Sequence, residues 1–130
     1  MPSLKILYIE DNNENRLLIR RVLMAEGHDF FEAETAKKAL EWLSTNNPEV
    51  ILIDINMPEI DGYSLTPRIR SISGHETVTI IAITANALRG DREKSLLAGC
   101  NGYIQKPIDV DLLPTQILEF WRTNVSVQSV

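Results

Sequence analysis

Short apolar runs that each lead into a chemically reactive residue recur along this chain, and they restrict the folds open to it. The run at 50–53 shows no polar alternation and the run at 78–83 is nearly as apolar, which is typical of strands covered on both faces of a parallel sheet. Segments with apolar residues at helical spacing separate the runs. This alternation predicts an α/β fold with one doubly wound parallel sheet.

The expected elements form five consecutive strand–helix units. Strands are predicted over 4–9, 28–33, 50–54, 78–83 and 103–105. Helices are expected after the first strand up to Gly27, from an N-cap at Thr35 to before 46, between Gly62 and Gly74 with Pro67 inside, over 88–98, and along the stripe Val110, Leu113, Ile117 and Trp121. With the strands in the order 2-1-3-4-5, these units make the flavodoxin-like (βα)5 sandwich. We assign residues 1–122 to this single domain and 123–130 to a short tail.

Net charge and cysteine content restrict the binding partners and the cellular compartment that we expect for this protein. A formal net charge of −5 over 130 residues argues against non-specific binding to nucleic acid or to an anionic membrane. Arg16, Arg20 and Arg21 form a basic cluster, which we interpret as a solvated helix face. The lone Cys100 excludes a disulfide within the chain and favours a reducing compartment. Because no apolar stretch approaches the ~20 residues of a membrane helix, we expect a cytoplasmic protein without direct contact to membrane or nucleic acid.

Reactive residues stand at the predicted strand ends. Glu10 and Asp11 follow the first strand, Asp54 ends the third, Thr84 follows the fourth, and Lys106 follows the fifth. In the order 2-1-3-4-5 these ends meet at one edge of the sheet, where sites form in open α/β folds. Three adjacent carboxylates repel one another unless a cation lies among them, and Mg²⁺ suits one or two direct carboxylates with retained waters. The sequence therefore predicts a magnesium site beside Asp54, with a hydroxyl and an ammonium group on its far side.

The segments around these residues resemble the receiver domains of two-component response regulators, the CheY-like superfamily, over residues 4–122. The matching segments are Ile9–Asn12, Asp54–Pro58 with Asp61-Gly62, Ile83–Asn86 and Gly102–Pro107. Their order and spacing together carry the resemblance, because each segment alone is unspecific. Glu10 stands where many members carry a second aspartate, and Pro67 inside the third helix is unusual.

The resemblance implies a role for each site residue. Asp54 would accept a phosphoryl group from a phosphohistidine, so the chain would catalyse its own phosphorylation and dephosphorylation rather than act as a conventional enzyme. Asp11 and Asp54 would bind Mg²⁺ directly, the backbone carbonyl of Asn56 would be a further ligand, and Glu10 would bind through water. Lys106 would pair with a phosphoryl oxygen.

Further roles concern signal output and tuning. Thr84 would hydrogen-bond the phosphoryl group, and Tyr103 would rotate inward as Thr84 moves. Asn56 and Asn86 would tune hydrolysis. A cis Lys106-Pro107 bond is open to this chain at modest cost and would aim the ammonium group into the site.

The expected partners follow from these roles. A histidine kinase or a histidine phosphotransfer protein would donate the phosphoryl group. Phosphorylation would change the face made by the fourth helix, the fifth strand and the last helix, which would bind a downstream protein or a second copy in a homodimer.

Other classes of protein would require different residues at these positions. A haloacid-dehalogenase-like phosphatase would need an aspartate where Asn56 stands, and a P-loop nucleotidase would need a Gly-rich Lys-Ser/Thr motif that the sequence lacks. The remaining alternative is a receiver-like binding module that acts without phosphorylation.

Overall fold

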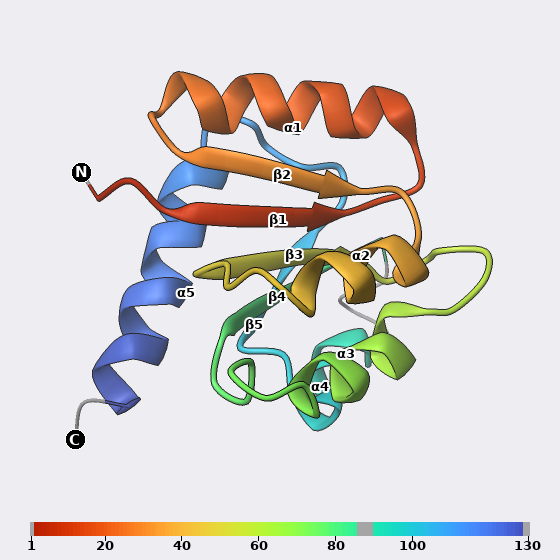
Figure 1. The fold of residues 1–130 in the computed structure, drawn as a ribbon. Coiled ribbons are helices and arrows are strands. Elements are labelled where there is room, and N and C mark those ends of the chain that lie inside the picture. Colours follow the sequence, from red (N-terminus) through yellow and green to blue (C-terminus); the bar gives the residue numbers. More distant parts are fainter. Residues whose placement is uncertain (1, 86–89, 129–130) are drawn as a thin grey trace.

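The computed structural model describes residues 2–85 and 90–128, and five parallel strands form its centre (Figure 1). The strands are β1 (Lys5–Ile9), β2 (Asp29–Ala33), β3 (Val50–Asp54), β4 (Thr79–Thr84) and β5 (Gly102–Gln105). Their order is β2-β1-β3-β4-β5, and all four pairings are parallel. The predicted fold class and strand order are confirmed. Asn86 and the expected helix start at 88 lie outside the described residues.

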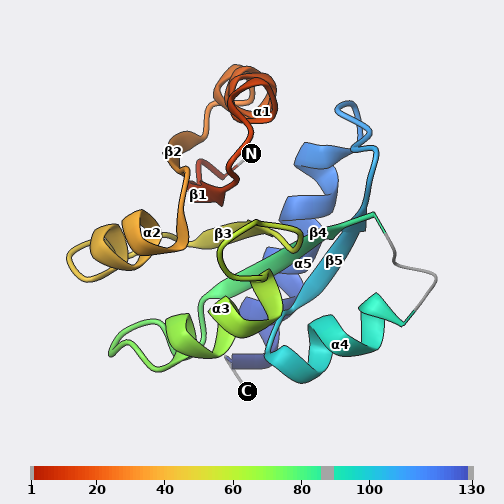
Figure 2. The same ribbon diagram turned by 90° about the vertical axis from the view of Figure 1, so that its right-hand side faces the viewer.

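Helices cover both faces of the sheet (Figure 2). α1 (Asn13–Ala25) and α5 (Leu113–Gln128) lie on one face, and α2 (Ala36–Leu43), α3 (Gly62–Arg70) and α4 (Asp91–Ala98) lie on the other. The four apolar residues 50–53 of β3 are fully buried between two hydrophobic clusters, one on each face. A strand covered on both faces explains the missing polar alternation.

Side-chain caps begin three of the helices. Oδ1 of Asn12 accepts the backbone N–H of Asn15, the Thr35 hydroxyl accepts that of Lys38, and Oδ1 of Asp61 accepts that of Ser64. The predicted N-cap at Thr35 is confirmed. Caps of this kind satisfy N–H groups that the first helical turn leaves without partners.

The end of α3 differs from the prediction, whereas the end of α1 agrees with it. α3 ends at Arg70 rather than near Gly74, because the backbone N–H of Ile72 bonds back to Ile69 and tightens the chain into a turn. Gly74 adopts φ 96° in the loop that follows. Gly27, in contrast, directly follows the C-cap of α1 with φ 85°, the left-handed conformation that glycine adopts without a Cβ clash.

The last helix is longer and begins later than predicted. α5 starts at Leu113, so Val110 lies in the preceding turn, and it continues to Gln128 beyond the expected end at residue 122. Nδ2 of Asn124 donates to the carbonyl of Thr77, and Nε2 of Gln128 donates to the same carbonyl. Residues 123–128, assigned above to a tail, are therefore helical and bonded to the loop before β4.

No described helix is both long enough and apolar enough to span a bilayer.

Gly62 allows α3 to approach the loop that follows Asp54. A Cβ at this position would lie 2.6 Å from Cδ1 of Ile55 and 2.9 Å from Cγ2 of Ile53. The backbone N–H of Gly62 donates to the carbonyl of Ile55 at 3.1 Å. The close approach of α3 thus holds the backbone immediately after Asp54 in place.

We predict that Gly62→Ala lowers the free energy of unfolding by about 1–3 kcal/mol, the usual range for overpacking. Urea denaturation followed by circular dichroism measures the change. Ile55→Val removes the methyl group nearest to the added Cβ. The loss of unfolding free energy caused by Ile55→Val should therefore be smaller in the Gly62→Ala protein than in the wild type, or become a gain. A Gly62→Ala variant as stable as the wild type would contradict this packing account.

Candidate functional site

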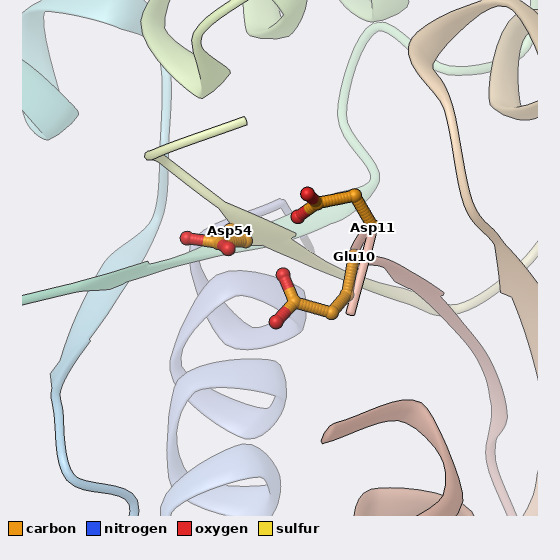
Figure 3. Close-up of side chains that lie close together, drawn as sticks. All are labelled: Glu10, Asp11 and Asp54. Carbon is orange, nitrogen blue, oxygen red and sulfur yellow. The ribbon is translucent and has the colours of Figure 1, made fainter. Parts of the chain in front are cut away.

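Three carboxylates gather where β1 and β3 end (Figure 3). Ile9 of β1 pairs with Ile53 of β3, so Glu10 and Asp54 leave the sheet side by side. Carboxylate oxygens of Glu10, Asp11 and Asp54 all lie within 4.8 Å of one another. The structure brings together the acidic residues that the sequence placed at this edge.

Asp54 is buried, and both described nitrogen donors bond to the same one of its oxygens. The residue is only 3% exposed to solvent. Oδ1 accepts a hydrogen bond from Nζ of Lys106 at 2.9 Å and from the backbone N–H of Asn56 at 3.0 Å. Among the described residues no nitrogen donor reaches Oδ2. Burial alone would raise the pKa of Asp54, but hydrogen bonds from Glu10, Lys106 and the Asn56 N–H outweigh it and hold this pKa below its usual value.

The pKa of Glu10 is shifted in the opposite direction, above its usual value. It is 1% exposed, and its Oε1 accepts a hydrogen bond from Nδ2 of Asn15 at 2.5 Å, whereas its buried Oε2 has no partner among the described residues. Burial and the neighbouring Asp54 carboxylate raise the pKa of Glu10 to about 8. Near neutral pH, in the absence of a cation, the pair therefore holds one proton on Glu10 and a negative charge on Asp54.

The donor set fits a hard divalent cation. Asp11 is exposed beside the two buried carboxylates, so a cation could keep waters on that side. The partnerless Oε2 of Glu10 is an oxygen that a cation, or water bound to it, would satisfy. All donors are oxygens, as Mg²⁺ prefers.

The other predicted residues lie on the neighbouring strands. Thr84 is fully buried at the end of β4, and its carbonyl accepts the backbone N–H of Lys106 at 2.7 Å. The Lys106-Pro107 peptide bond is cis. Tyr103 lies deeper along β5, where it pairs with Ala82, and is half-buried outside the carboxylate cluster. The site therefore comprises the acidic cluster and Lys106, with Thr84 beside it and Tyr103 at a distance along the strand.

Arg16 is a supporting residue that the sequence analysis placed wrongly on a solvated face. It is only 8% exposed, its Nη1 donates to the backbone carbonyl of Glu10 at 2.8 Å, and its Nη2 donates to Oδ1 of Asn13 at 3.2 Å. Arg16 shares a buried stripe with Ile19 and Leu23. That helical spacing was a signal in the sequence that Arg16 faces inward.

Comparisons with known proteins agree with this geometry. The family model described as response regulator receiver domain matches residues 6–118. The polar-differentiation response regulator DivK of Brucella ovis is 33% identical over 105 residues, which cover 81% of this chain and 85% of that protein. The sensor protein EvgS of Escherichia coli O157:H7 is 37% identical over 115 residues, which cover 88% of this chain but only 9% of that protein.

A solved structure extends the likeness to the fold. The receiver domain of the sensor histidine kinase PA1611 from Pseudomonas aeruginosa PAO1, crystallised with a magnesium ion coordinated in its active-site cleft, superposes with a TM-score of 0.83 at 35% identity. The match covers 92% of this chain and 98% of that one. The family match and the fold agree, and the chain belongs to the response regulator receiver domain family.

Proposed function

We propose that Asp54 accepts a phosphoryl group from a phosphohistidine in two-component or phosphorelay signalling. The observation that carries the proposal is the state of this carboxylate: it is buried, its pKa is lowered, and both of its nitrogen donors bond to Oδ1. No described nitrogen donor reaches Oδ2, which is the oxygen we assign as the nucleophile. A buried carboxylate held in place through its other oxygen is suited to in-line attack.

The transfer exchanges one bond to phosphorus for another. An electron pair on Oδ2 of Asp54 forms the new P–O bond, the P–N bond of the phosphohistidine breaks, and its electron pair returns to the imidazole nitrogen. The product is an acyl phosphate on Asp54. Lys106, which bonds the Asp54 carboxylate before the reaction, is close enough to pair with a phosphoryl oxygen afterwards.

Asp11, Asp54 and the backbone carbonyl of Asn56 would hold Mg²⁺, with Glu10 bound through water. When bound, the cation would supply positive charge for the phosphoryl oxygens. The partnerless Oε2 of Glu10 and the exposed position of Asp11 support this ligand set.

A groove beside the site supports docking of the phosphoryl donor. It has a volume of about 540 Å³ and runs past Lys106 between α1 and the segment after β5, where Leu18, Pro107 and Ile108 line it. Leu18 is 48% exposed. A helix of a histidine kinase or histidine phosphotransfer protein, packed on this apolar wall, would bring its phosphohistidine to the open edge of the sheet. A phosphoryl donor of this kind would meet the protein in the cytoplasm. The cytoplasm is a reducing compartment, in which the buried Cys100 would remain a free thiol.

The output would pass through the face made by α4, β5 and α5. Thr84 would bond the new phosphoryl group and Tyr103 would turn inward, changing this face. Leu96 and Leu97 on α4 are 50% and 87% exposed, which supports binding of a protein surface there. The partner is a downstream protein or, in a homodimer, a second copy. Gel filtration before and after phosphorylation distinguishes the two, because only self-association changes the mass of the isolated protein.

Covalent modification by a small phosphoryl donor tests the role of Asp54. Incubation with acetyl phosphate and Mg²⁺ should add one phosphoryl group to the wild-type protein, as measured by intact-mass spectrometry. Omitting Mg²⁺ should slow the gain at least about tenfold, because the carboxylates then repel the incoming anion. Asp54→Asn keeps the size of the side chain but removes the nucleophile, so this variant should gain nothing.

Asp61→Asn is the matched control, because Asp61 is an exposed N-cap whose oxygen an asparagine can replace. It should gain the phosphoryl group as the wild type does. A wild-type protein that gains no mass under these conditions would instead support the phosphorylation-independent binding module.

The pH dependence of stability tests the protonation of Glu10. Without a divalent cation, the folded protein binds a proton on Glu10 more tightly than the unfolded chain does, since folding raises the pKa of Glu10 from 4.5 to about 8. This stabilisation is complete below the unfolded pKa and is lost as the pH rises through about 8. Relative to Glu10→Gln, which mimics the protonated group, the wild type should lose unfolding free energy across this window by at most about 1.4 kcal/mol per pH unit, the limit for one proton.

Urea denaturation at a series of pH values measures this difference. Taking the wild type relative to Glu10→Gln cancels the effect of other groups, such as the buried His28, whose pKa is lowered mainly by burial. Addition of Mg²⁺ should flatten the wild-type decline, because the cation replaces the proton. Parallel curves for the two proteins without Mg²⁺ would show that Glu10 is not held protonated by the fold.

A further inference from the structure

The guanidinium of Arg70, the last residue of α3, uses all of its donors at the base of the sheet. Nε and Nη2 donate to the carbonyl of Gly99 at 3.3 and 2.8 Å, and Nη2 also donates to Oδ1 of Asn101 at 2.9 Å. Nη1 donates to the carbonyls of Val78 and His75 at 2.5 and 3.4 Å. An arginine has five N–H donors in a fixed planar fork, so this group joins three segments in one geometry.

Asn101 extends the connection to β4 and α5. Its Oδ1 also accepts the backbone N–H of Ile80 at 2.8 Å, and its Nδ2 donates to Oδ1 of Asn124 on α5 at 3.1 Å. Nδ2 of Asn124 in turn donates to the hydroxyl of Thr79 at 2.8 Å. A continuous set of hydrogen bonds therefore ties α3, α4 and α5 to the start of β4, at the end of the sheet opposite Asp54.

The C-terminal end of α4 is the element most firmly held by this set. Gly99, the C-cap of α4, has φ 107° and gives its carbonyl to Arg70. Beyond it, the backbone N–H of Cys100 donates to Ser95 and that of Asn101 donates to Ile80 at 2.7 Å. The buried thiol of Cys100 lies 3.6 Å from the hydroxyl of Thr66 on α3.

The first turn of α4 has a different kind of contact with the sheet. The guanidinium of Arg92 lies over the ring of Tyr103 on β5, 6.0 Å from its centroid, and Arg92 is exposed. An exposed cation–π contact at this distance is weak compared with several hydrogen bonds from a partly buried guanidinium. Inward rotation of Tyr103 would break the contact of Arg92 while leaving every partner of Arg70 in place.

We propose that Arg70 is a positioning residue that fixes the C-terminal end of α4 to α3 and β4, so that phosphorylation makes α4 pivot about Gly99 rather than shift as a whole. The fixed end holds in the unphosphorylated protein and stands independently of the site. The pivot rests on the proposed phosphorylation of Asp54. The first turn of α4 would then move on the output face, while Leu96, Leu97 and the rest of its C-terminal end stay in register with β5.

Amide hydrogen exchange measured by mass spectrometry tests the fixed end first, in the unphosphorylated full chain. Arg70→Met removes all five donors, and exchange of the amides of 96–101 should rise at least about tenfold while that of β1 and α2 is unchanged. Arg70→Lys keeps the charge but loses the fork, and should show the same local rise to a smaller extent. Arg68→Met, at an exposed position in the same last turn of α3, is the matched control and should leave exchange unchanged.

The pivot is tested after phosphorylation with acetyl phosphate and Mg²⁺, checked by intact mass. In the wild type, exchange should rise in 92–95 and stay within about twofold at 96–101, whereas in the Arg70 variants both parts should rise. Equal rises along the whole wild-type helix would overturn the pivot. If exchange in either Arg70 variant rises equally throughout the protein, or not at all at 96–101, the anchoring role is wrong.

The two proposals fail separately. A wild-type protein that gains no phosphoryl group would contradict the proposed function, while the unphosphorylated comparison would still decide whether Arg70 holds the end of α4. Arg70→Lys provides this comparison if Arg70→Met does not fold.

Discussion

The repulsion among three carboxylates at the ends of two buried strands is the constraint on which the rest of this site depends. Parallel pairing of β1 with β3 places Glu10 beside Asp54, and burial removes the water that would otherwise screen them. The structure relieves this repulsion in two ways, with Lys106 bonded to Asp54 and with a proton held on Glu10 at neutral pH. A bound divalent cation would relieve it more completely, which links metal binding to the reactivity of Asp54.

Much of the remaining structure positions these charges. Arg16 bonds the backbone carbonyl of Glu10, and the close approach of Gly62 fixes the backbone after Asp54. The hydrogen bonds of Arg70 and Asn101 lie at the opposite end of the sheet. There they join the C-terminal ends of α3 and α4 to the C-terminal half of α5. The domain thus combines a rigid base with an edge at which charge can change, an arrangement suited to transmitting a local chemical event to a distant face.

The sequence predicted the strands and the meeting of Glu10, Asp11 and Asp54 at one edge of the sheet, because both follow from short-range patterns. An apolar run such as 50–53 is typical of a strand buried on both faces, and the residue that follows such a strand lies at the edge of the sheet. The C-terminal extension of α5 and the role of Arg70 depend instead on tertiary hydrogen bonds. The extension of α5 through Gln128 rests on a bond to Thr77, far away in the chain, which periodicity does not encode. The turn after α3 rests on the local bond from Ile72 back to Ile69, which the apolar pattern also does not show. Arg70 likewise acquires its role only when Gly99 and Asn101 are brought beside it.

The central claim is that Asp54, rather than one of the two acidic residues beside it, is the nucleophile. Borohydride reduces an acyl phosphate to an alcohol and leaves free carboxylates unchanged, so it marks the modified side chain. We would treat the acetyl phosphate-labelled protein with borohydride and sequence its peptides by tandem mass spectrometry. The account predicts homoserine at position 54 and unmodified acids at Glu10 and Asp11. Reduction at either of those positions, with Asp54 intact, would contradict it.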